Sequence, residues 1–187
     1  MKFQSMFRSL SGFFALAVVL FISSSTGSAQ SSDSDKISDL LLQAENHAMI
    51  AQNEAALLES YTGSKVSWQS HGTRLRQMKD HVNELGSLNK QLSDLRSEGS
   101  PWQQTAIDQV DTRLREVADL LSATIMHMSD NPSQIHFQTY RDYVRTNYEL
   151  ISDPSKMIGE CVDYDQAKSK AEALEQQLNL AAAQDSV

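Results

Sequence analysis

The chain has 187 residues, and its acidic residues outnumber Lys and Arg by 24 to 16, which gives a formal net charge of -8. Nucleic acid is therefore not an expected partner, because phosphate contacts require a surplus of Lys and Arg on one face. The single cysteine, Cys161, has no second cysteine with which to form an intramolecular disulfide. It either joins two chains or serves as a small buried hydrophobic residue.

Residues 1–29 have the pattern of a secretory signal peptide. Lys2 and Arg8 precede an apolar run over residues 13–22, and small residues follow before Gln30. The apolar run is about ten residues long, short of the roughly 20 that span a bilayer, so no membrane span is expected in the mature chain. An uncleaved anchor is the alternative. The remaining chain is long enough for one domain with its own core.

Apolar and small residues recur at steps of three and four from Ile37 to Leu58, which predicts a helix that ends near Gly63. Its seam is mostly alanine, which lets neighbouring backbones approach closely. A second apolar stripe lies on the opposite side of the same helix and consists of Leu42, Met49, Ile50 and Leu57. Either another segment of the chain covers this stripe, or it is a face for a protein partner or for self-association.

A second helix is expected to begin within residues 64–70 and to reach about Glu98, with Trp68 and His71 in its inward stripe. A glycine, Gly99, then ends it.

The third helix has a marked start at Ser100. Ser100, Pro101 and Gln103 supply an N-cap, a proline at the first helical position and the reach-back glutamine of a capping box. From Ile107 to Met128 the apolar stripe then keeps the three-four spacing that is also typical of coiled coils.

The same order of residues recurs at Asn131, Pro132 and Gln134, which predicts the start of a fourth helix with Phe137 facing inward. The third proline predicts that the last helix is kinked or broken at Pro154. The segment after that proline either extends the fourth helix, the preferred geometry, or folds back on the second stripe of the first helix.

The expected fold class is all-α, an antiparallel up-down four-helix bundle of long helices over residues 30–180, followed by a disordered tail over residues 181–187. Neither a glycine- or proline-rich linker nor strand-like alternation interrupts the bundle segment.

Four runs carry a resemblance: SWQSHGTRLRQMKDHVNELG, SPWQQTAID, YRDYVRTNYEL and CVDYDQAKSKAEALEQQL. They resemble a group of uncharacterised exported bacterial all-helical proteins. The resemblance covers most of the chain after residue 29 and implies export and a fold of long helices. It implies no activity and no binding residues.

The familiar enzyme signatures are missing from the sequence. No histidine has a glutamate three positions before it, so the Glu-x-x-His pairs of di-iron bundles are absent. There is also no His-Glu-x-x-His, no Gly-x-Ser-x-Gly and no Cys-x-x-Cys-His. We therefore expect no catalytic residues and no cofactor.

Histidines nevertheless offer one alternative. The Met-His-Met run at 126–128 suits a soft metal, but successive side chains on a helix point about 100° apart and do not converge. An up-down bundle would bring His71, His127 and His136 to one end, as a metal or haem-edge cluster. Otherwise His71 is a core residue and the other two are solvated.

Non-covalent haem held by His71 with Met78 or Met128 is a further alternative, without a spacing that supports it. We interpret His47 and His81 as ordinary boundary residues.

Two functions from different classes remain. The first is a non-catalytic exported helical bundle, periplasmic or secreted, that acts as an interaction or structural module of the cell envelope through the second stripe of its first helix. The second is a bundle that binds metal or haem through His71, His127 and His136.

Overall fold

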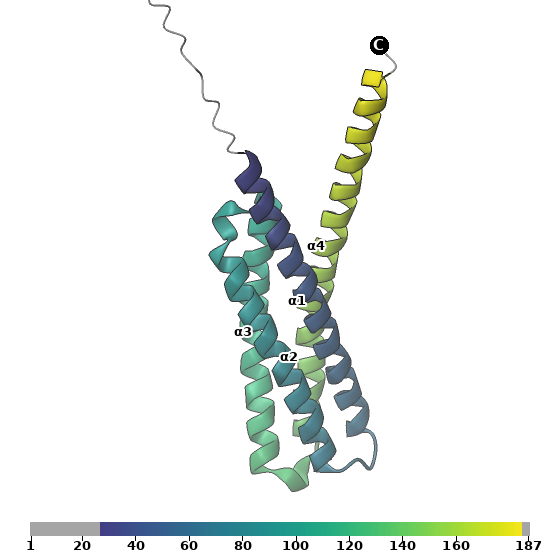
Figure 1. Ribbon diagram of the computed structural model, residues 1–187. Helices are drawn as coiled ribbons and strands as arrows, with labels where there is room; N and C mark the ends of the chain where they lie inside the picture. Colours follow the sequence, from purple (N-terminus) through teal and green to yellow (C-terminus); the bar gives the residue numbers. More distant parts are fainter. Residues whose placement is uncertain (1–26, 185–187) are drawn as a thin grey trace, which may run out of the picture.

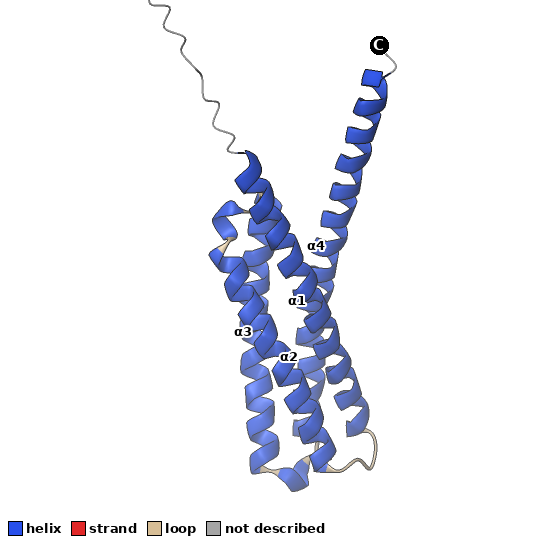
Figure 2. Ribbon diagram, viewed as in Figure 1, coloured by secondary structure: helices blue, strands red, loops and turns tan. Residues whose placement is uncertain are grey.

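The computed structural model describes residues 27–184, and the side-chain surroundings of residues 33–181. Within this range the chain is all-helical, with no strand (Figure 1, Figure 2). The elements are α1 (Gly27–Thr62), α2 (Trp68–Asp94), the short 3-10 helix η1 (Arg96–Glu98), α3 (Pro101–Asp130), the 3-10 helix η2 (Pro132–Gln134) and α4 (Gln138–Gln184). Each α-helix contacts the next one in the chain, and α4 also contacts α1.

Two predicted segments fall partly outside the described residues. Of the predicted signal peptide, residues 1–29, only residues 27–29 are described, and they begin α1. Of the predicted tail, residues 181–184 lie in α4, and residues 185–187 lie outside the described part. Among the helices that are described, none is long and apolar enough to cross a membrane.

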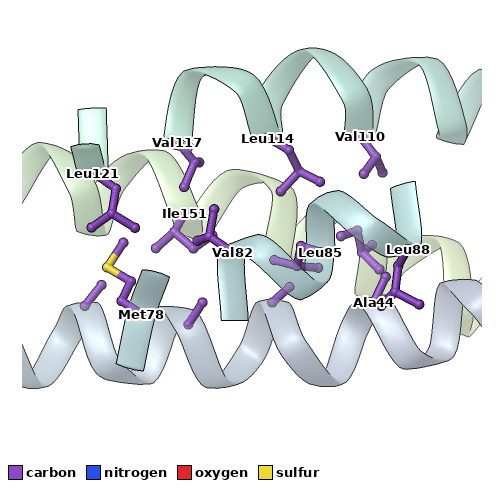
Figure 3. Close-up of a cluster of buried hydrophobic side chains, with 14 of the residues drawn as sticks. Ala44, Met78, Val82, Leu85, Leu88, Val110, Leu114, Val117, Leu121 and Ile151 are labelled. Carbon is purple, nitrogen blue, oxygen red and sulfur yellow. The ribbon is translucent and has the colours of Figure 1, made fainter. Parts of the chain in front are cut away.

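The core forms where the apolar stripes of the helices meet (Figure 3). The predicted seam of α1 is buried from Ile37 to Leu58, as is the predicted stripe of α3 from Ile107 to Met128. Burying each large aliphatic side chain of this kind contributes about 1.5–3 kcal/mol. Two predicted core residues are instead exposed: Trp68, at 47%, is the first residue of α2, and Phe137, at 59%, precedes α4.

A buried glutamine ties the start of α3 to α1. The capping box predicted at Ser100 is present, and the side chain of Gln103 is fully buried. Gln103 Oε1 accepts a hydrogen bond from the Ser100 backbone N–H at 2.9 Å, and Gln103 Nε2 donates to the Ser34 carbonyl oxygen at 3.2 Å. One side chain therefore caps α3 and fixes its position relative to α1.

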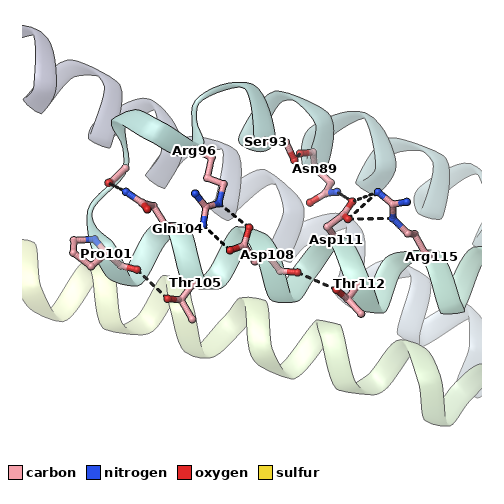
Figure 4. A network of polar contacts seen from close by, with 11 residues as sticks. Asn89, Ser93, Arg96, Pro101, Gln104, Thr105, Asp108, Asp111, Thr112 and Arg115 are labelled. Atoms are coloured by element: carbon pink, nitrogen blue, oxygen red, sulfur yellow. Dashed lines mark hydrogen bonds and ion pairs between the residues drawn. The ribbon is translucent and has the colours of Figure 1, made fainter.

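Polar contacts also join α2 and η1 to α3 (Figure 4). Arg96 makes two hydrogen bonds of 2.7 Å to the carboxylate of Asp108, and Asn89 Nδ2 donates to Asp111 Oδ1 at 2.7 Å. The Arg96–Asp108 pair is exposed, so it orients the connection more than it stabilises the fold.

The predicted start of the fourth helix at Asn131 is wrong. The Asn131 side chain makes no cap for the following residues; its Nδ2 donates to the carbonyl oxygen of His127 at 3.1 Å and so terminates α3. The residues after it form the single turn η2, and α4 begins only at Gln138. The capping sequence is thus used at the end of one helix rather than at the start of the next.

Of the two outcomes predicted at Pro154, a kink and a break, the break does not occur, because α4 continues through this residue without interruption. Proline lacks an N–H and normally disrupts a helix interior at a cost of about 3 kcal/mol. Here hydrogen bonds to α1 hold α4 on both sides of the proline. The side chain of Gln52 in α1 donates to Ser152 Oγ at 3.1 Å and accepts from Ser155 Oγ at 3.0 Å. Pro154 and Ser155 are buried, so tertiary contacts outweigh the local propensity.

Replacing Gln103 with alanine should lower the free energy of unfolding by about 1–3 kcal/mol, because it leaves the Ser100 N–H and the Ser34 carbonyl without their buried partner. Urea unfolding followed by circular dichroism measures the loss. Gln109→Ala, at an exposed position of the same helix, is the matched control and should change stability little. Equal effects of the two variants would contradict the assigned role of Gln103.

Candidate functional site

The second apolar stripe of α1, hereafter the outer stripe, consists of Leu42, Met49, Ile50 and Leu57. Three of these large side chains are exposed, at 50% for Leu42, 51% for Met49 and 43% for Leu57, and Ile50 is half-buried. In the part of the chain that is described, no segment buries Leu42, Met49 or Leu57, which the first of the two explanations offered by the sequence requires. A row of exposed large apolar side chains along about 22 Å of helix is a candidate contact surface.

Polar contacts hold α1 on both flanks of the outer stripe. On the side that faces α2, the Arg74 guanidinium forms a salt bridge of 3.0 Å with Glu54 and donates a hydrogen bond of 3.2 Å to the Tyr61 hydroxyl. On the α4 side, Gln52 bonds both Ser152 and Ser155. Because both sides of α1 are fixed in this way, the outer stripe is presented on a rigid helix, which lowers the entropy lost when a partner binds.

The three histidines of the metal hypothesis lie near one another but do not form a ligand set. His71 is fully buried, and its Nδ1 lies 3.1 Å from the Tyr140 hydroxyl. The ring of His127 stacks on the same tyrosine at a centroid distance of 6.4 Å, while His136 is exposed. Among the described residues, no three His, Cys, Asp or Glu side chains gather closely enough to hold a metal ion.

The surroundings of His71 favour its neutral form. Burial, and then the nearby charge of His136, lower the pKa of His71 from its ordinary value of 6.5. Burial also raises the pKa of Tyr140, so this hydroxyl keeps its proton. The thioether of Met128, one of the possible haem ligands, lies 4.0 Å from the Tyr140 hydroxyl. His71 and Tyr140 are therefore a neutral pair inside the core, joined through His71 Nδ1, while His71 Nε2 has no hydrogen-bond partner.

Two other histidines meet where the sequence predicted only boundary residues. His47 of α1 and His81 of α2 place their Nδ1 atoms 3.0 Å apart. The ring centroids are 5.3 Å apart, which is the separation expected when the two nitrogens point straight at each other. In this geometry the Nδ1–H of one imidazole donates to Nδ1 of the other. If the two Nδ1 atoms instead shared a metal ion, their lone pairs would converge on the ion at an angle.

A shallow groove of about 440 Å³ lies at the other end of the bundle, between α3 and α4. The rings of Trp102 and Tyr164 meet edge to face at 5.1 Å along it, and Cys161 is half-buried in its wall. Burial and the charge of Glu160 raise the pKa of the Cys161 thiol, so the thiol stays protonated and weakly nucleophilic at neutral pH. The groove therefore has an apolar wall without an activated nucleophile.

Comparisons of the chain with models of protein families, with curated proteins and with solved structures gave no match.

The buried His71 should make stability depend on pH. Its pKa is lower in the folded state, so as the pH falls below about 6.5 the unfolded chain takes up a proton that the folded chain does not, and stability decreases. The urea midpoint should therefore fall between pH 7.5 and pH 5, and His71→Gln should reduce that fall.

His136→Gln is the control, because it removes only the smaller cause of the shift and should keep most of the pH dependence. An NMR titration of the His71 ring in the unaltered protein gives an independent reading. A midpoint at or above 6.5 would contradict the assignment.

Proposed function

We propose that this protein is a non-catalytic interaction module of the cell envelope that binds a protein partner through the outer stripe of α1. The observation that carries the proposal is the exposure of Leu42, Met49 and Leu57 on one face of a helix whose opposite face is buried. Single exposed apolar side chains are ordinary on protein surfaces, but a row along one rigid helix matches the face that an amphipathic helix of a partner would cover.

The chemistry of the side chains is consistent with binding rather than catalysis. The buried His71 is neutral and hydrogen-bonded, and the Cys161 thiol is protonated. A catalytic pair needs a nucleophile or acid within reach of a base in an accessible site. The proposal therefore rests on the outer stripe of α1.

The proposal includes export and a finer description of the bundle. The charged start and short apolar run of residues 1–29 support delivery to the periplasm or the medium. We further propose that the helices alternate in direction as an antiparallel up-down bundle and that α4 bends at Pro154. Short connections between α1, α2, α3 and α4, together with contacts between successive helices, support the first; the missing N–H of proline supports the second.

A photo-crosslinking amino acid at Met49 should join the protein to one envelope partner in cells. The same group at Met126, an exposed methionine of α3, is the matched control and should give no such adduct. Leu57→Glu should abolish the adduct at Met49, because it places a charge in the same apolar face. An adduct that forms equally at both positions, or survives Leu57→Glu, would contradict binding through the outer stripe.

Export predicts a shortened protein. Expression of the full chain in a bacterial host should yield a protein that begins near Gln30, as measured by intact mass and N-terminal sequencing of the periplasmic fraction and the medium. Replacing Leu20 with arginine, which interrupts the apolar run, should block processing. A protein that keeps residues 1–29 would instead support the uncleaved anchor.

A further inference from the structure

The last part of α4 extends beyond the other helices. Figure 1 shows its yellow end standing apart from α1, and all residues described from Gln166 to Ala181 are exposed. Such a segment gains little stability from tertiary packing, because none of its side chains is buried. Leu174 and Leu178 are nevertheless exposed, at 51% and 70%.

The exposed apolar residues of this segment form a regular stripe. We define the α4 extension as residues 164–181, and its stripe is Tyr164, Ala167, Ala171, Leu174, Leu178 and Ala181. The steps alternate between three and four, which is the a and d pattern of a coiled coil. At its lower end, Tyr164 still packs on Trp102 of α3, and the other residues of the stripe are exposed along the α4 extension.

We propose that two copies of this chain associate through their α4 extensions as an antiparallel two-helix coiled coil. In the proposed register, the centre of the dimer lies between Ala171 and Leu174 of each copy. Every layer then joins a small side chain to a large one: Ala171 meets Leu174 of the second copy, Ala167 meets Leu178, and Tyr164 meets Ala181. Matching small and large residues across facing positions gives layers of even thickness.

The charges on the flank of the stripe support the same register. Lys168 and Glu175 occupy equivalent e positions, and in an antiparallel pair e positions face e positions. With the centre given above, Lys168 of each copy lies opposite Glu175 of the other. The dimer therefore has two symmetric ion pairs. In the single chain Lys168 instead reaches Glu172 on its own helix, at 3.6 Å.

The other direction of pairing is disfavoured by the same helix. Seven and fourteen residues before Ala167 stand Glu160 and Asp153, both exposed, so the d row becomes acidic where α4 joins the bundle. A parallel dimer would continue along this row and place each acid opposite its own copy, which is repulsive. In the antiparallel dimer the two acidic regions lie beyond opposite ends of the contact.

The contact spans about 27 Å of helix and has an area below about 1,200 Å², the range of weak and reversible association. We therefore expect a dimer with a dissociation constant on the order of 100 µM. This surface is separate from the outer stripe of α1, and the inference does not depend on the proposed function.

Sedimentation equilibrium of the protein purified after expression of the full chain tests the proposal, at up to about 500 µM protein to exceed the expected dissociation constant. We expect a monomer–dimer equilibrium. Leu174→Glu should abolish it, because it places a charge in the central layer. The matched control is Leu180→Glu, since Leu180 is similarly exposed but lies outside the stripe. Met49→Glu, in the outer stripe of α1, should leave the dimer unchanged.

Charge reversal tests the direction of pairing. Lys168→Glu and Glu175→Lys should each weaken dimerisation by about fivefold or more, because both symmetric pairs become repulsive. The double variant should restore it to near the original value. In a parallel dimer the facing residues are Asp163 with Lys168 and Lys170 with Glu175, so the double variant would be worse than either single one.

Circular dichroism at low concentration confirms that the variants remain helical. A protein that stays monomeric throughout this range overturns the proposal. So does a dimer that survives Leu174→Glu, or a double charge reversal that restores nothing.

Discussion

Close contact along the alanine seam of α1 is the constraint on which the rest of the structure depends. The seam residues Ala44, Ala48, Ala51 and Ala55 are at most 1% exposed. Their methyl groups let α2 and α4 approach α1 toward the short end of the roughly 8–10 Å range for helix pairs. They bury little apolar area themselves, so the larger side chains that face them, such as Met78 and Leu85, supply most of the hydrophobic stabilisation. A larger residue in the seam would displace both neighbours at once.

Most of the helical fold could be predicted from the sequence, because burial follows the three-four spacing wherever a helix is flanked by others, as from Ile107 to Met128. The errors arise at helix ends and at proline, where local signals compete with tertiary contacts. Asn131 has a capping sequence on its C-terminal side, yet its side chain bonds the helix before it. Pro154 predicted a kink or a break, yet α4 is continuous there, and Ser155 is buried and bonded to Gln52.

The candidate sites were less predictable than the fold. The outer stripe of α1 could be predicted from the spacing of residues within that helix, and three of its four side chains are exposed in the structure. Its role in binding remains a prediction. The contact between His47 and His81 depends on how α1 and α2 are rotated and shifted relative to each other, which spacing within one helix does not specify. The same holds for the bond between His71 and Tyr140. After Tyr164 the apolar residues are spaced by three and four positions, which indicates a stripe. This spacing does not indicate that α4 extends past the bundle.

The bonds of Gln52 with Ser152 and Ser155 have a consequence for the order of folding. They join residues 100 and 103 positions apart, whereas neighbouring helices are linked by short turns. The entropy lost on closing a loop grows with the logarithm of its length, so contacts between successive helices form more readily than the contact between α1 and α4. Bundle closure is then a late event, and the alanine seam stays partly uncovered until α4 arrives. Weakening the Gln52 contacts would accelerate unfolding and leave the folding rate almost unchanged.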